Sequence, residues 1–226
     1  KIESGKNFKI VDYSKIVNMN VCKDLNLGID PSLFTSNQIK KFFFKNNKVT
    51  FIKKNLIDNI FRFKSKKKLP FYSLDKKITG EGHQMKISKV LSYLKRYNCD
   101  YLLVTAPENI AWVLNIRGYD NPTSPIPNSL LIISKNKKIF LIAEKYKTTR
   151  LISEKKLSKK QIIDPKNISN FLNTLNSGNI LIDEKTCSIF LEKTLRERFN
   201  LIKKEDPIYY FKSIKNDIEI NNMIKS

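Results

Sequence analysis

Residues 100–127 read DYLLVTAPENIAWVLNIRGYDNPTSPIP and combine a strand pattern, a helix pattern and a polar loop. The apolar run 101–104 has the length and residue types of a buried strand. Pro107 suits the first turn of a helix, because that turn cannot use the N–H that proline lacks. The helix carries the only tryptophan, Trp112, and is followed by a loop with three prolines. The stretch therefore predicts a rigid scaffold that presents the polar side chains of its loop.

Three polar side chains of this loop are candidates for a functional site. The Arg117 guanidinium can offer a planar donor fork to a carboxylate, and Asp120 can hold Arg117 or a substrate amine. In a purely structural alternative, Arg117 and Asp120 pair with each other, Asn115 caps the helix and Gly118 adopts a left-handed turn. Both interpretations stay open, and the substrate- or cleft-facing candidates are Asn115, Arg117 and Asp120.

Hydrophobic periodicity predicts the remaining elements. Apolar residues recur at i, i+3, i+4 and i+7 from Ile87 to Leu94, which is typical of an amphipathic helix. Strands are expected at 8–11, 25–29, 49–52, 101–104, 130–133, 139–142, 161–163, 180–182 and 201–202. Helices are expected at 36–43, 55–61, 86–96, 107–114, 144–151, 169–175 and 188–199. Helices alternating with strands, with one hairpin at 130–142, predict an α/β fold with a mixed β-sheet flanked by helices.

The same pass along the chain predicts its division into parts. Residues 1–63 are too few for a complete α/β domain. A lysine run and two glycines without sustained periodicity predict a linker at 64–81. Residues 82–212 make one complete unit, and 213–226 begin another element, in which Asn216 and Glu219 have the spacing of a capping box.

Composition argues against several classes of function. The formal charge is +22, but only six of the 43 basic residues are arginine, the better residue for base and phosphate contacts. Scattered lysines make nucleic acid an unexpected partner. No apolar run reaches the roughly 18 residues that a membrane helix needs. The three cysteines, Cys22, Cys99 and Cys187, lack metal or redox spacing and are expected to be reduced.

The opening stretch resembles the middle domain of the three-domain Xaa-Pro aminopeptidases, which carry a similar IAW–N–RG–D phrase. Four further segments resemble that family in the same order: LGIDP at 27–31, NLIDNIF at 55–61, ITGE at 78–81 and KNDIE at 215–219. The resemblance implies a creatinase/prolidase N-terminal-domain-like fold. It implies that residues 1–63 end a first domain of related fold, and that 213–226 begin a catalytic domain.

The resemblance also implies a chemistry. Family members use two divalent metal ions, usually manganese, held in the third domain by two Asp, one His and two Glu. This chain has one histidine, His83, without such a pattern around it, so no catalytic or metal-binding residue is expected among its 226 residues. The family commonly places a His three residues after the loop Asp, whereas this chain has Thr123.

The function implied is that of a cytoplasmic metallopeptidase that removes the N-terminal residue from peptides with proline in second position. This region would cover the active-site cleft, restrict substrate size and aid assembly. The implied partners are the protein's own catalytic domain and short proline-containing peptides, with a homodimer left open. The alternative is a stand-alone interaction module or an inactive relative of the same fold, with weak nucleic-acid binding through its basic surface.

Overall fold

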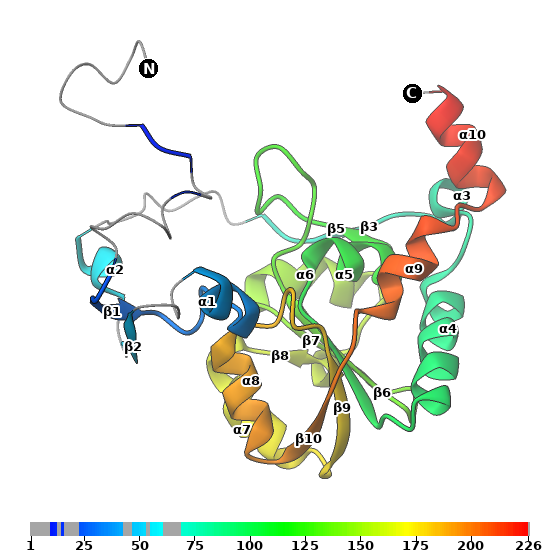
Figure 1. The fold of residues 1–226 in the computed structure, drawn as a ribbon. Coiled ribbons are helices and arrows are strands. Elements are labelled where there is room, and N and C mark those ends of the chain that lie inside the picture. Colours follow the sequence, from blue (N-terminus) through cyan, green and yellow to red (C-terminus); the bar gives the residue numbers. More distant parts are fainter. Residues whose placement is uncertain are drawn as a thin grey trace. The chain divides into compact units, whose positions relative to one another are not determined.

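The computed structural model describes residues 10–12, 15, 23–42, 47–52, 55–60 and 69–225. The chain divides into a smaller unit, Lys1–Arg62 with Ser188–Phe190, and a larger unit, Phe63–Cys187 with Leu191–Ser226. Each unit has its own β-strands (Figure 1) and its own cluster of buried apolar side chains.

The smaller unit contains a pair of parallel strands and two short helices. Its elements are β1 (Asn26–Ile29), α1 (Ser36–Phe42), β2 (Lys48–Phe51) and α2 (Leu56–Ile60). Thr35 and Gln38 each accept the other's backbone N–H with a side-chain oxygen, and this exchange caps the start of α1. The strand predicted at 8–11 lies partly outside the described residues, and Ile10 and Val11 are not in a strand.

The larger unit is built on a six-stranded sheet with the order β10–β9–β4–β6–β7–β8. Its strands are β4 (Tyr101–Val104), β6 (Leu130–Ser134), β7 (Ile139–Ile142), β8 (Ile162–Ile163), β9 (Gly178–Ile182) and β10 (Phe199–Lys203). Only β6 is antiparallel to its neighbours, so the other five strands have their carboxyl ends at the same edge. The predicted mixed sheet is confirmed.

Helices cover both faces of this sheet. They are α4 (His83–Arg96), α5 (Pro107–Leu114), α6 (Lys145–Ser153), α7 (Ile168–Thr174), α8 (Ile189–Arg196) and α9 (Pro207–Ser213), with short 3₁₀ turns η3 (Lys159–Gln161) and η4 (Pro165–Asn167). Strand β4 illustrates why both faces must be covered. Successive side chains of a strand point to opposite faces, and all four of its side chains are buried. Leu102 and Val104 pack with α4, α5, α6 and α9, whereas Tyr101 and Leu103 pack with α7 and α8. In Figure 1, α4 and α9 accordingly lie on one side of the sheet and α7 and α8 on the other.

Two pairs of smaller elements complete the larger unit. Strands β3 (Tyr72–Ser73) and β5 (Ile116–Arg117) form an antiparallel ribbon. Helix α3 (Lys76–Thr79) contacts the last described helix, α10 (Asp217–Lys225). The Asn222 side-chain amide donates a hydrogen bond of 3.0 Å to the Ile78 carbonyl. The predicted capping box is confirmed, because Asn216 and Glu219 exchange bonds of 3.1 and 3.0 Å.

The structure corrects the sequence prediction in two places. The segment predicted as a featureless linker carries β3 and α3. The helix predicted at 188–199 ends at Arg196, and Phe199 begins β10 instead. There the Phe199 ring lies edge-on to Tyr101, with centroids 5.5 Å apart, and pairing with β9 overrides the helical pattern. Within the described residues, every helix is too short or too polar to cross a bilayer.

Candidate functional site

Helix α5 ends at Asn115, whose backbone adopts the left-handed conformation with φ 51° and ψ 49°. Asn115 is only 3% exposed. Its amide nitrogen donates to Thr79 Oγ1 at 3.1 Å and to the Glu81 carbonyl at 2.7 Å, and its Oδ1 accepts from Lys86 Nζ at 2.7 Å. Asparagine tolerates this backbone better than most residues. The predicted cap is confirmed, and its side chain ties α5 to α3 and α4.

The ammonium group of Lys86 lies at the centre of this arrangement. Lys86 is 1% exposed and has no carboxylate within ion-pair distance in the described part of the chain. Its Nζ also donates to the Trp112 carbonyl at 3.1 Å and lies 4.1 Å from the Trp112 ring centroid. Burial lowers the pKa of Lys86 to about 8, although Glu219 and Glu81 partly oppose this. The cation is stabilised by carbonyl oxygens at the negative end of α5.

Arg117 and Asp120 do not form the ion pair that the sequence left open. Arg117 donates from Nη1 to the carbonyls of Ala111 (3.2 Å) and Ile116 (2.9 Å), and burial lowers its pKa. Asp120 instead pairs with Lys147, at 2.8 Å between Oδ1 and Nζ. Among the described residues Arg117 therefore has no carboxylate partner, and three of its five N–H groups have no hydrogen-bond acceptor there.

The left-handed turn considered for Gly118 is not present, and glycine is needed there for a different reason. Among the described glycines, only Gly80 has a positive φ, so Gly118 makes no left-handed turn. A Cβ at Gly118 would instead lie 2.9 Å from Pro127 Cα and 3.0 Å from both the Ile126 carbonyl oxygen and Phe71 Cδ1. Glycine is required there because the two sides of the loop approach closely.

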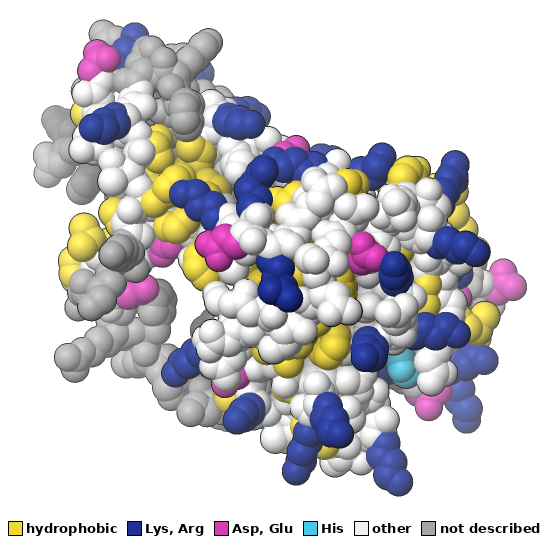
Figure 2. Space-filling model, turned by 90° about the horizontal axis from the view of Figure 1, so that it is seen from below, with side chains coloured by type: hydrophobic (Ala, Val, Ile, Leu, Met, Phe, Trp, Pro, Cys, Tyr) yellow, Lys and Arg dark blue, Asp and Glu magenta, His cyan; other side chains and the backbone are white. Residues whose placement is uncertain are grey.

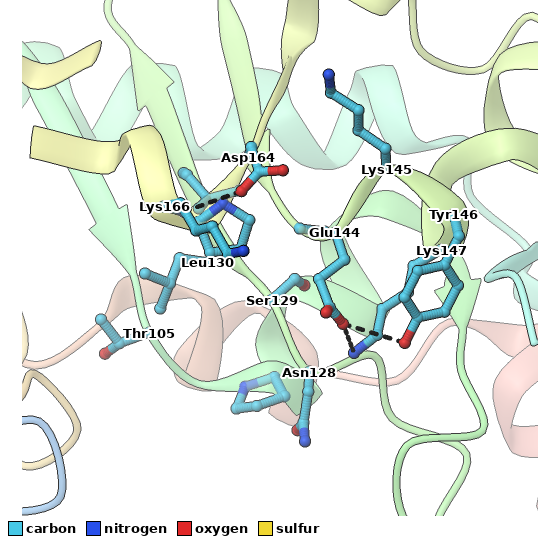
Figure 3. A pocket seen from close by; sticks show the side chains of 14 residues that line it. Thr105, Asn128, Ser129, Leu130, Glu144, Lys145, Tyr146, Lys147, Asp164 and Lys166 are labelled. Atoms are coloured by element: carbon cyan, nitrogen blue, oxygen red, sulfur yellow. Dashed lines mark hydrogen bonds and ion pairs between the residues drawn. The ribbon is translucent and has the colours of Figure 1, made fainter. Parts of the chain in front are cut away.

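A cavity of about 660 Å³ opens where the carboxyl ends of β4, β7 and β8 meet, which is the usual ligand-binding edge of an α/β sheet. It is lined by Thr105, Pro107, Asn128, Ser129, Leu130, Ile142, Ala143, Glu144, Lys145, Tyr146, Lys147, Asp164, Pro165 and Lys166 (Figure 3). Its volume is that of a small-molecule site.

The rim of this cavity is joined to the polar loop through Lys147. Lys147 Nζ contacts Glu144 Oε2 at 3.4 Å (Figure 3) as well as Asp120. Glu144 also accepts the hydroxyl of Tyr146 at 3.0 Å. Glu144 and Asp164 are the only acids among the lining residues, and no three His, Cys, Asp or Glu side chains of the described chain gather into a metal-binding group. The described residues thus do not fit a two-metal centre.

Sequence reasoning missed a buried acid beside this edge. Asp206, 2% exposed, caps α9 by accepting the Ile208 N–H at 2.9 Å, and accepts the Asn109 amide at 2.7 Å. Asp183 Oδ2 accepts the Asp206 N–H at 3.0 Å, and Asn109 Oδ1 accepts from Lys212 at 2.6 Å. The signal was an Asp immediately before a Pro, which is typical of a helix start.

Lowering the pH should favour the folded larger unit through Asp206. Burial raises the pKa of this carboxyl from 3.8 to about 6. Between these two pKa values the folded unit holds a proton on Asp206 that the unfolded chain has released. The stabilisation from this proton is negligible at neutral pH and grows as the pH falls, to about 2 kcal/mol near pH 4.5. The parent chain and Asp206→Asn are unfolded with urea at neutral pH and at about pH 4.5. Because the two chains share all other acids, the change in their difference isolates the contribution of Asp206. An unfolding free-energy difference independent of pH would contradict this.

Comparison with known proteins agrees with this architecture. Residues 63–219 match the profile of the Creatinase/Prolidase N-terminal domain. Xaa-Pro aminopeptidase 1 of Dictyostelium discoideum is 26% identical over 223 residues, which cover 90% of this chain and 34% of that protein. Xaa-Pro aminopeptidase ApepP of Drosophila melanogaster is 32% identical over 143 residues, covering 61% of this chain and 23% of that protein. The chain thus spans about a third or less of these relatives.

A solved structure is similar over nearly the whole chain. The X-prolyl aminopeptidase of Caenorhabditis elegans, described as a cytosolic enzyme with a di-nuclear active site, superposes with a TM-score of 0.75. The superposition covers 99% of this chain and 38% of that one, at 22% sequence identity, and shows a shared fold. Because the profile match covers well over half of its residues, the chain belongs to the creatinase/prolidase N-terminal domain family.

Proposed function

We propose that this chain forms a non-catalytic N-terminal and middle-domain region of a cytoplasmic Xaa-Pro aminopeptidase. Such an enzyme hydrolyses the bond before proline and releases the N-terminal residue of a peptide. The main support for the proposal is that 90% of this chain matches an Xaa-Pro aminopeptidase. This match reaches beyond the family domain into the smaller unit. The cytosolic C. elegans enzyme supports the compartment.

In this proposal, catalysis by metal ions belongs to the part of the relatives that this chain does not match. The di-nuclear C. elegans enzyme is in keeping with two ions there, which would activate water for attack on the peptide bond. This region would cover the cleft, limit the length of peptide that enters and help the domains assemble. Of the three candidate residues, Asn115 is buried with its amide fully engaged, so Arg117 is the one we assign to substrate or to a facing acid, with Asp120 positioning the loop through Lys147.

The dispersed charge supports this reading over a nucleic-acid module. On the face shown in Figure 2, Lys and Arg side chains are scattered among neutral and acidic ones rather than gathered into one patch. A dedicated nucleic-acid interface concentrates basic residues on one face or along one helix. The excess of lysine is therefore better explained as a solvated surface.

Two assays test the proposal. The natural polypeptide that carries these residues should release the N-terminal residue from an Xaa-Pro-Xaa peptide, lose this activity with a chelator and regain it with manganese. The 226-residue chain alone, loaded with manganese, should release none, because its described acids form no metal-binding group. Failure of the natural polypeptide to cleave any Xaa-Pro bond would refute the function. Metal-dependent cleavage by the chain alone would refute the non-catalytic role.

A further inference from the structure

Two aromatic and two basic side chains lie close together at the β3–β5 ribbon. Tyr72 and Arg117 are directly opposite each other in the antiparallel register, so their side chains project to the same face. Tyr119 follows two residues after Arg117, and its ring centroid lies 5.2 Å from that of Tyr72, with 36° between the planes. From α6, the Arg150 guanidinium lies 6.0 Å from the Tyr72 ring centroid.

These four residues, Tyr72, Arg117, Tyr119 and Arg150, are called the tyrosine–arginine patch below. Tyr119 is 57% exposed, so much of its surface faces solvent. Arg150 uses Nε for Glu154 (2.6 Å), and Arg117 uses Nη1 for backbone carbonyls. The other guanidinium N–H groups of both arginines have no protein partner in the described part of the chain. The patch thus joins an open aromatic surface to unused donors that favour carboxylates.

We propose that the tyrosine–arginine patch binds a short proline-containing peptide that ends in a free carboxylate. Aromatic surfaces recognise proline rings in many peptide-binding domains, and a guanidinium pairs with a carboxylate through parallel hydrogen bonds. The inference rests on the proposed function, since it names where the substrate peptide meets this region. It extends that function by adding Tyr72, Tyr119 and Arg150 to Arg117.

The neighbouring charges favour a peptide over a nucleic acid. Tyrosine and arginine also stack on and pair with single-stranded nucleic acid. However, Glu154 lies against Arg150, and Asp120 directly follows Tyr119 in the chain. These carboxylates already neutralise Arg150 and Lys147, so little net positive charge is left to hold a continuous phosphate backbone. One terminal carboxylate can still pair with the free side of a guanidinium.

Direct binding tests the proposal without any catalytic step. The 226-residue chain is titrated with Ala-Pro-Leu, with its C-terminal amide and with Ala-Leu-Leu, and binding is followed through the NMR signals of the tyrosine rings. Ala-Pro-Leu should shift the Tyr72 and Tyr119 signals. The amide should bind about tenfold more weakly, the effect of one charge-assisted hydrogen bond. Ala-Leu-Leu should also bind more weakly, because it lacks the proline ring.

Variants identify the side chains involved. Arg150→Gln and Tyr119→Ala should each weaken Ala-Pro-Leu binding several-fold to about tenfold, with unchanged melting temperature because both side chains are exposed. Arg96→Gln is the matched control, since Arg96 lies 5.7 Å from the Tyr97 ring, outside the patch. Equal affinity for the acid and the amide, or equal loss in Arg96→Gln, would overturn the proposal.

A thymidine decamer tests single-stranded nucleic acid as the alternative ligand of the patch. Displacement of the peptide by this oligonucleotide, with an affinity that falls in Arg150→Gln, would assign the patch to nucleic acid and overturn the peptide site. The outcome is separable from that of the functional assays. Peptide binding here with an inactive natural polypeptide would refute the aminopeptidase but keep the site, and an active polypeptide without binding here would refute only the site.

Discussion

Replacing Asn115 with alanine should lower the free energy of unfolding of the larger unit by about 3–5 kcal/mol. Three terms add up. Alanine in a left-handed backbone costs about 1 kcal/mol. The Lys86 ammonium loses a charged hydrogen bond of 2.7 Å in a site from which water is excluded, which costs about 1.5–3 kcal/mol. The bonds from the Asn115 amide to α3 and to the Glu81 carbonyl are lost as well.

Asn98 provides a matched control in the same unit. It has a similar backbone, with φ 50°, but its side chain is exposed and forms no hydrogen bond among the described residues. Asn98→Ala should therefore cost only the backbone term, about 1 kcal/mol. Asn115→Gly removes the backbone strain and keeps the loss of the amide, so it should fall between the two. Urea unfolding followed by circular dichroism gives all three values. Equal costs in Asn98→Ala and Asn115→Ala would show that the buried amide does not stabilise the unit.

Arg117→Ala should have the opposite profile, with a large effect on turnover and a small one on stability. Its Nη1 bonds go to the backbone carbonyls of Ala111 and Ile116, and its own side chain is only half-buried, so the loss should cost about 1 kcal/mol of stability. If the free donors meet a carboxylate of the substrate or of a facing domain, kcat/KM of the natural polypeptide should fall roughly ten- to a hundredfold, as expected for a charged hydrogen bond of about 1.5–3 kcal/mol.

Two further variants separate charge from geometry. Arg117→Lys should restore only part of the activity, because an ammonium cannot reproduce the bidentate fork. Arg96→Ala, which removes an arginine beside Tyr97 on α4, should leave kcat/KM unchanged. Melting temperature and kcat/KM are measured on the same preparations. A large drop in melting temperature with normal turnover of the folded fraction would make Arg117 a structural residue and remove it from the site.

The elements of the larger unit could be predicted because their patterns are local. The four buried residues of β4, the Pro at the start of α5 and the hairpin at 130–142 each specify their structure within a few residues. The β3–β5 ribbon could not be predicted, because a pairing of two residues between Tyr72 and Arg117 depends on a contact across 45 positions of the chain. The same limit explains why the helix at 188–199 was extended too far, since the strand beside β9 decides where it ends.

The candidate site shows the same division. The role of Asn115 as a helix cap could be predicted from its place after an apolar helix. Its hydrogen bond to Lys86 could not, because the two residues are 29 positions apart in sequence. Nothing in the sequence distinguishes Lys86 from the lysines that are exposed. The sequence left a pair between Asp120 and Arg117 open and gave no sign of Lys147, the actual partner of Asp120, because Lys147 comes from α6.

The hydrogen bond between Trp112 and α10 gives the protein an intrinsic optical reporter. The indole Nε1 of this single tryptophan donates to Glu219 Oε1 at 3.3 Å, and Glu219 also closes the capping box at the start of α10. Detachment of α10 would break this bond and admit water to the indole edge, so the fluorescence emission maximum should move to longer wavelength. Because no other tryptophan contributes, the emission would follow the docking of this one helix, with Glu219→Gln as the variant that weakens it.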